Sequence, residues 1–77
     1  MGAKLAFQYD READILYITS RPPSPAQETQ ELGDDVIARL NPYSGDVESL
    51  EVLFLSTRLL RSDVFALPVT ADIHRAG

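Results

Sequence analysis

A chain of 77 residues forms at most one small domain, and a domain of this size hides only about 60% of the surface that its unfolded chain exposes. Its 12 acidic and 7 basic side chains give a net charge of −5, which repels phosphate backbones and argues against nucleic-acid binding. The sequence has no cysteine and a single histidine, which excludes disulfides, thiolate metal sites and the usual multi-histidine metal sites.

The first predicted element is a hairpin, in which strands over residues 4–9 and 15–20 flank a charged segment, residues 10–14. Two apolar runs around a short polar segment are typical of antiparallel strands joined by a turn. Asp10 can accept hydrogen bonds from backbone N–H groups two residues further on, and Asp14 can close the loop from its far end. The second strand is apolar on both faces, which favours a place inside the sheet.

Three prolines within residues 21–25 cannot join a hydrogen-bonded sheet, so this segment is predicted to be an exposed, extended connection. The polar residues 27–32 predict a short edge strand, because charge on an edge discourages unwanted pairing. After a turn at 33–34, residues 36–40 alternate as a further strand. Residues 41–45, Asn-Pro-Tyr-Ser-Gly, predict a turn in which the glycine takes the left-handed conformation.

Residues 46–54 predict the last strand, and the apolar period then changes from two to the helical spacing of Leu55, Leu59 and Leu60. A short helix is therefore expected to run to about residue 61, with Ser56 capping its first turn. These elements predict a small α+β fold, with a meandering antiparallel sheet of four or five strands and one short C-terminal helix packed on one face. The whole chain, 1–77, is expected to be one domain, with a core at about 4–61 and a C-terminal extension at 62–77.

The order of several short motifs also carries information. The motifs begin with Tyr9-Asp10, Ala13-Asp14 and Leu16-Tyr17-Ile18 and continue with Thr29-Gln30-Glu31. The last of them is the segment 51–56, which starts with glutamate and ends with serine. In this order and spacing, residues 4–60 resemble the small bacterial proteins grouped as domain-of-unknown-function family 2283. The segment 48–51 and the triple-proline connection depart from the usual family pattern. The resemblance implies no established activity, and it implies candidate antitoxin-type partners of small basic toxins.

The acids Asp10, Glu12 and Asp14 alternate like the first half of a calcium-binding loop. However, Ile15 stands where that loop requires glycine, and Arg21 stands where it requires glutamate. A capped, solvated hairpin turn is therefore the favoured interpretation. A small metal-dependent enzyme or ligand-binding protein that uses this acidic hairpin loop is the alternative.

No constellation of catalytic residues is visible. None of the serines lies in a Gly-x-Ser-x-Gly elbow, and His74 stands near the chain end, where an ordered catalytic role is not expected. No glycine-rich phosphate loop is present in the sequence either. We therefore predict no catalytic residue, no cofactor and no metal ligand, and we do not expect an enzyme.

The apolar residues exceed what one covered sheet face needs. If the helix covers one face, Ile15, Tyr17 and Ile37 lie on the opposite face, and uncovered apolar patches of this kind often mark interfaces. These three residues are the interface candidates, and the expected function is a non-catalytic protein-interaction module, antitoxin-like in character. A second copy of the chain or a small basic protein is the expected partner.

The same sequence gives expectations about location. No apolar run approaches the roughly 18 residues that a membrane-spanning helix needs, and no signal peptide is visible. We therefore expect a cytoplasmic protein that binds neither membranes nor nucleic acid.

Overall fold

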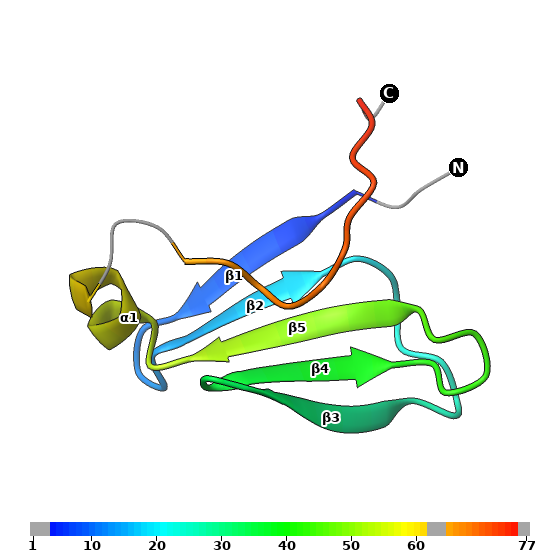
Figure 1. Ribbon diagram of the computed structural model, residues 1–77, viewed down its shortest axis with the longest axis horizontal. Helices are drawn as coiled ribbons and strands as arrows, with labels where there is room; N and C mark the ends of the chain where they lie inside the picture. Colours follow the sequence, from blue (N-terminus) through cyan, green and yellow to red (C-terminus); the bar gives the residue numbers. More distant parts are fainter. Residues whose placement is uncertain (1–3, 62–64, 76–77) are drawn as a thin grey trace.

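The computed structural model describes residues 4–61 and 65–75, which form one five-stranded antiparallel sheet and one short helix (Figure 1). In chain order the elements are β1 (Ala6–Asp10), β2 (Ile15–Thr19), β3 (Glu28–Gly33), β4 (Val36–Leu40), β5 (Val47–Leu53) and α1 (Leu55–Arg61). The α+β fold predicted from the sequence is confirmed. The predicted extension, 62–77, lies only partly within the described residues.

The strand order, β1-β2-β5-β4-β3, places β5 at the centre of the sheet and β1 and β3 at its two edges. The chain departs from a simple meander at one point. After β2, the connection to β3 leaves two positions in the sheet empty, and β4 and β5 later occupy them. β5 then returns to fill the gap and pairs with both β2 and β4. The long proline-containing connection, residues 20–27, makes this step in the order possible.

One face of the sheet forms the hydrophobic core. Val36 of β4 stands opposite Val52 of β5, and Ala38 stands opposite Leu50, so that alternate side chains of both strands point to the same side. These four side chains are buried. The partly buried side chains that pack against this core are Ile18, Leu32, Leu40, Val47, Leu67 and Val69.

The C-terminal segment covers this core face, since Leu67 and Val69 pack against the core cluster after the chain has left the helix (Figure 1). Helix α1 was expected on the face itself, and it lies instead beyond the end of β5. The reason is local: only Phe54, at a φ of 53°, separates β5 from the helix. Such a short link leaves the helix at the end of the sheet, where among the described residues its side chains are not part of the core packing.

The turns follow the chemistry of their residues. In the turn after β4, Asn41 accepts hydrogen bonds from the backbone N–H groups of Tyr43 and Ser44, and Gly45 has a φ of 79°, as the sequence predicts. Between β3 and β4, Asp34 and Asp35 form a two-residue hairpin loop with φ values of 50° and 61°. Positive φ at both positions matches the type I′ loop that suits the twist of a hairpin.

Candidate functional site

The three interface candidates come together on the face of the sheet opposite the core. Tyr17 of β2 and Ile37 of β4 both stand opposite Glu51 of β5, one on each side, while Ile15 stands opposite Leu53. All three candidates are partly buried by their neighbours. The described C-terminal segment crosses the other face. Within residues 4–61 and 65–75, this surface, which we call the open face, is therefore lined by the sheet alone.

A polar cluster lies at the centre of the open face. Glu51 is buried, and its carboxylate accepts a hydrogen bond of 2.5 Å from Nε of Arg39. The guanidinium of Arg39 also donates to the hydroxyl of Thr29 on β3, at 3.0 Å. The buried charge is thus paired, and three neighbouring strands are linked across their exposed side.

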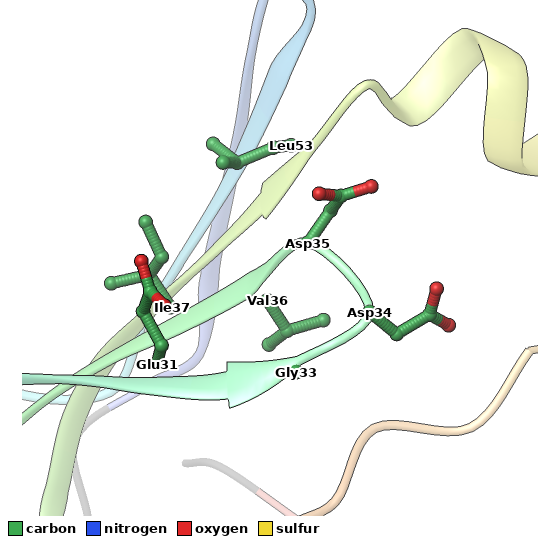
Figure 2. A pocket seen from close by; sticks show the side chains of 7 residues that line it. All are labelled: Glu31, Gly33, Asp34, Asp35, Val36, Ile37 and Leu53. Atoms are coloured by element: carbon green, nitrogen blue, oxygen red, sulfur yellow. The ribbon is translucent and has the colours of Figure 1, made fainter.

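A shallow hollow of about 240 Å³ continues the open face toward the β3–β4 hairpin loop (Figure 2). Ile37 and Leu53 form its apolar wall, and Ile37 is one of the interface candidates, whereas the side chain of Val36, which also borders the hollow, is buried in the core. The acidic residues that line the hollow are Glu31, Asp34 and Asp35. Since Glu31 stands opposite Ile37 in the sheet, acidic and apolar side chains lie next to each other here.

The acidic residues that line the hollow differ in whether their carboxylates form ion pairs. Asp34 forms an ion pair with Arg58 at 3.1 Å and a longer one with Arg61 at 3.7 Å. Within residues 4–61 and 65–75, the carboxylates of Glu31 and Asp35 have neither a hydrogen bond nor an ion pair. The hollow therefore offers two carboxylates that are free within this part of the chain, beside an apolar wall.

The acidic hairpin loop has a structural role that the sequence predicted in part. Asp10 accepts hydrogen bonds from the backbone N–H groups of Glu12 and Ala13, at 3.0 and 3.1 Å, and this confirms the predicted capped turn. Asp14, however, does more than close the loop. Its carboxylate accepts hydrogen bonds from the hydroxyl of Tyr9 at 2.6 Å and from both the backbone N–H and the hydroxyl of Ser56.

Asp14 also takes the capping role that the sequence assigned to Ser56. Because α1 begins at Leu55, the N–H of Ser56 is one of the donors that the first turn of a helix leaves unpaired. The carboxylate of Asp14 accepts a hydrogen bond from this N–H group, and the backbone carbonyl of Asp14 accepts one from the N–H of Leu55. The hairpin loop therefore fixes the start of the helix.

These contacts shift two pKa values in opposite directions. The hydrogen bond from Tyr9, followed by those from the hydroxyl and N–H of Ser56, lowers the pKa of Asp14. The same hydrogen bond to the carboxylate raises the pKa of Tyr9, because it stabilises the protonated phenol. Both shifts indicate a carboxylate held in its charged form as a structural acceptor.

A buried arginine connects the helix to the rest of the molecule. Arg58 donates to the carboxylate and to the backbone carbonyl of Asp34, in the β3–β4 loop. Its guanidinium also lies over the ring of Phe65, 5.0 Å from the ring centre, which is cation–π geometry. Within the described part of the chain its Nε is buried without a hydrogen-bond partner. Arg58 thus joins the helix, the hairpin loop and the C-terminal segment.

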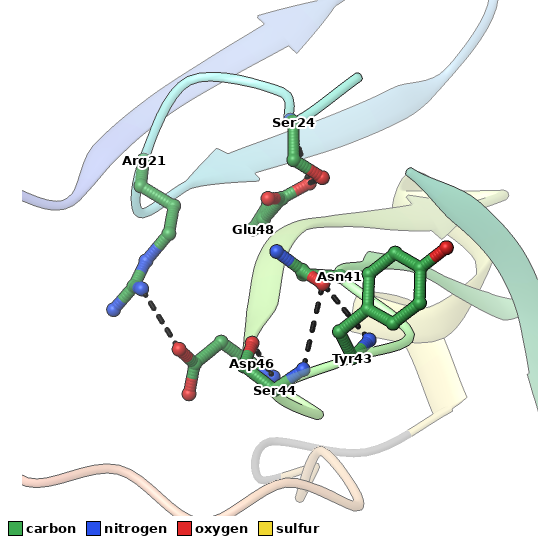
Figure 3. Close-up of polar contacts among 7 residues, drawn as sticks. All are labelled: Arg21, Ser24, Asn41, Tyr43, Ser44, Asp46 and Glu48. Carbon is green, nitrogen blue, oxygen red and sulfur yellow. Dashed lines mark hydrogen bonds and ion pairs between the residues drawn. The ribbon is translucent and has the colours of Figure 1, made fainter. Parts of the chain in front are cut away.

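A buried glutamate anchors the proline-containing connection (Figure 3). The carboxylate of Glu48 accepts hydrogen bonds from the N–H and hydroxyl of Ser24 and from the side chain of Gln27. Its backbone carbonyl accepts the N–H groups of Ser20 and Arg21. The side-chain hydrogen bond from Gln27, followed by those from Ser24, lowers the pKa of Glu48. The connection is exposed, as predicted, but it is tied to β5 at both of its ends.

Two further findings concern metal binding and membrane-spanning helices. The described residues contain no group of three histidine, cysteine, aspartate or glutamate side chains placed to hold a metal ion. In the same part of the chain, no helix has both the length and the apolar character needed to cross a membrane.

The order of strands, turns and helix start can now be compared with known proteins. A family model described as "Protein of unknown function (DUF2283)" matches residues 6–56, which is well over half of the chain. The chain belongs to the DUF2283 family. No curated protein and no solved structure matches it. The resemblance found in the short motifs of the sequence is therefore confirmed.

The DUF2283 match includes the network around Asp14 from end to end. It begins at the first residue of β1 and ends at Ser56, so Tyr9, Asp14 and Ser56 all fall inside it. The segment of this chain that matches the family therefore contains both the capped hairpin turn and the anchor of the helix. Arg58 and Phe65 lie beyond the matched segment.

Sequence reasoning placed Ile15, Tyr17 and Ile37 on one face, and the strand pairing brings these three residues together. It missed Arg58 and Glu48. Arg58 looked like an ordinary basic residue near the end of a helix, and Glu48 looked like one charged position on a strand. The signal for Glu48 was its position, since it shares the alternation of the core residues Leu50 and Val52 and so points toward the covered side.

Proposed function

We propose that this DUF2283 protein is a non-catalytic protein-interaction module, which binds a small basic partner protein through its open face as an antitoxin binds its target. The observation that carries the proposal is the gathering of Ile15, Tyr17 and Ile37 on one sheet face, beside a hollow lined by acids. Aromatic and aliphatic side chains that flank a paired charge and adjoin acidic side chains give a surface of the mixed apolar and polar character that interfaces have.

Charge supports a basic partner. Glu31 and Asp35 are free of partners within the described residues, and they stand beside the apolar wall of the hollow. A lysine or arginine side chain matches this chemistry, because its apolar stem can pack on Ile37 while its charged end meets a carboxylate. The net charge of −5 would also steer a basic protein toward the molecule.

The test begins with the untagged protein in its native cells. Proteins that copurify with it are identified, and the candidate partner is then purified and titrated against the protein by calorimetry. Tyr17→Ala and Ile37→Lys are each expected to weaken binding by about tenfold or more, because they remove apolar contact on either side of Glu51. Glu31→Gln together with Asp35→Asn should reduce the association rate and its dependence on salt.

A matched control is available on the helix. Leu60 is 88% exposed and lies on α1, away from the open face, so Leu60→Ser is expected to leave the affinity unchanged. If no protein copurifies, or if a purified partner binds Tyr17→Ala and Ile37→Lys as tightly as the native chain, the open face is not the binding surface. Equal losses in all of the variants, the control included, would point to a general loss of stability instead.

A further inference from the structure

The two edges of the sheet differ in how well they are protected against pairing. On β3, Glu28 and Glu31 supply negative charge, and the register shifts between Glu31 and Gly33 as in a β-bulge. Charges and bulges are the usual means by which proteins keep an edge strand from pairing with another chain. One edge of this sheet is thus closed to association.

The β1 edge is less protected, because its one charged residue, Asp10, lies at the end of the strand. Residues 5–9, Leu-Ala-Phe-Gln-Tyr, carry no formal charge, and β1 pairs with β2 without a register shift. Every residue of β1 is exposed, and the exposed fractions of Leu5, Phe7 and Tyr9 are 48%, 64% and 43%. An edge strand whose central residues are uncharged and largely apolar favours strand pairing with another chain.

We propose that two copies of this chain pair through β1, antiparallel and about a twofold axis at Phe7, to form one continuous sheet. In this register Phe7 faces Phe7 of the second copy, and Leu5 faces Tyr9. These side chains alternate onto the same face as Leu16 and Ile18, so the apolar row continues from one copy into the next.

Charge complementarity identifies the second copy as the occupant. The same register sets Lys4 opposite Asp10 of the other chain, and the twofold axis produces this pair twice. Both residues lie on the side of the strand away from Phe7, where opposite charges directly across from each other are stabilising. The capping contacts of Asp10 use only Oδ1, which leaves Oδ2 available to the lysine within the described structure.

This pairing does not depend on the proposed function, since it uses the β1 edge and leaves the open face free. It is tested by sedimentation equilibrium of the full chain, up to millimolar concentration and without any partner protein. The native chain is expected to dimerise, and Phe7→Asp should weaken the dimer on the order of a hundredfold, because it opposes two carboxylates at the axis. Phe54→Asp is the control, since Phe54 is also an aromatic residue, 57% exposed, and lies outside β1.

The two pairs of Lys4 with Asp10 of the second copy test the register independently of Phe7. Lys4→Glu should weaken the dimer roughly fivefold by placing like charges opposite each other, and Lys4→Glu with Asp10→Asn should recover part of the loss. Circular dichroism shows whether each variant is folded, and Lys4 lies on the exposed surface before β1, where its replacement does not disturb the core. A native chain that stays monomeric overturns the proposal. So does a folded Phe7→Asp variant, or a Lys4→Glu variant, that dimerises as the native chain does.

Discussion

The carboxylate of Asp14 holds the backbone N–H and the hydroxyl of Ser56, 42 positions later in the chain, at 3.0 and 2.7 Å. The contact joins the first turn of the sheet to the first turn of the helix. A helix of seven residues is too short to be stable by itself in water, so its place depends on contacts of this kind. The acids of the hairpin loop, which look from the sequence like a candidate ion site, thus include the anchor of the helix.

The first prediction concerns this anchor. Asp14→Ala is expected to lower the melting temperature by several degrees, because it removes three hydrogen bonds and puts alanine at a φ of 58°. Asp14→Asn should cost less, since asparagine tolerates that φ and keeps one acceptor oxygen. Thermal unfolding followed by circular dichroism measures both. In a double-mutant cycle, Asp14→Ala and Ser56→Ala should be non-additive, and additive losses would mean that the contact contributes nothing to stability.

The second prediction is the dependence of stability on pH. The pKa of Asp14 is lower in the folded chain than its ordinary value of about 3.9, so its contribution is present above that value and is lost as the pH falls through the folded pKa. Glu48 acts in the same direction. The pKa of Tyr9 is raised, so its contribution is fully present below about 10 and is lost as the pH rises through the folded pKa.

Urea unfolding at a series of pH values measures the free energy of unfolding as a function of pH. Its decline at low pH is the acid limb of this curve, and its decline at high pH is the alkaline limb. Asp14→Asn should flatten the acid limb in part, with Glu48 retaining the remainder, while Tyr9→Phe should flatten the alkaline limb. An acid limb that is unchanged by Asp14→Asn would contradict the assignment of the lowered pKa to this network.

The third prediction concerns the buried arginine of the helix. Arg58→Met is expected to reduce the free energy of unfolding by about 1–2 kcal/mol, because it removes the hydrogen bonds to the backbone carbonyl and to the partly exposed carboxylate of Asp34. Arg58→Lys should not restore the loss, since an ammonium cannot reproduce both hydrogen bonds and the contact with Phe65. Arg61→Met is the control: Arg61 reaches Asp34 only at 3.7 Å with its side chain 55% exposed, and its loss should cost less than about 0.5 kcal/mol. Equal losses at Arg58 and Arg61 would contradict the role of Arg58.

The fourth prediction is a stabilising change in the β3–β4 loop. Asp35 has a φ of 61°, which glycine adopts without steric cost, so Asp35→Gly should raise the free energy of unfolding by about 0.5 kcal/mol after the entropy of the unfolded chain is counted. Asp34→Gly is the matched comparison. Asp34 has a similar φ of 50°, but its carboxylate pairs with the buried guanidinium of Arg58, so Asp34→Gly should lower the free energy of unfolding despite the same gain in the backbone. A destabilised Asp35→Gly variant would show that the carboxylate of Asp35 has a partner in the folded protein.

Much of the fold could be predicted from the sequence, because its determinants are local. Alternation places residues 36–40 correctly, and the turn after them follows from Asn41 and Gly45. The side of the sheet on which Ile15, Tyr17 and Ile37 gather follows from period-two alternation and antiparallel pairing alone. These are arguments about neighbours in the chain or across one pair of strands.

The position of the helix and the roles of Asp14, Arg58 and Glu48 could not be predicted in this way. Each depends on a contact between residues at least 21 positions apart: Asp14 with Ser56, Arg58 with Asp34, and Glu48 with Ser24 and Gln27. A pattern within a short window contains no information about such partners. The alternation of β5 places Glu48 on the core face, but it does not show that a connection with three prolines supplies the donors.

The last prediction concerns that connection. Glu48→Ala removes the acceptor of the Ser24 N–H, the Ser24 hydroxyl and the Gln27 side chain, so residues 20–27 should lose their attachment to the side chains of β5. Amide hydrogen exchange followed by NMR should then show the N–H of Ser24 exchanging much faster than in the native chain. Glu48→Gln keeps an acceptor oxygen and should give an intermediate rate. The N–H groups of Ser20 and Arg21 donate to the backbone carbonyl of residue 48 and should be far less affected. If all of these amides accelerate together, Glu48 stabilises the sheet as a whole, and its contact with the connection is not separable from the fold.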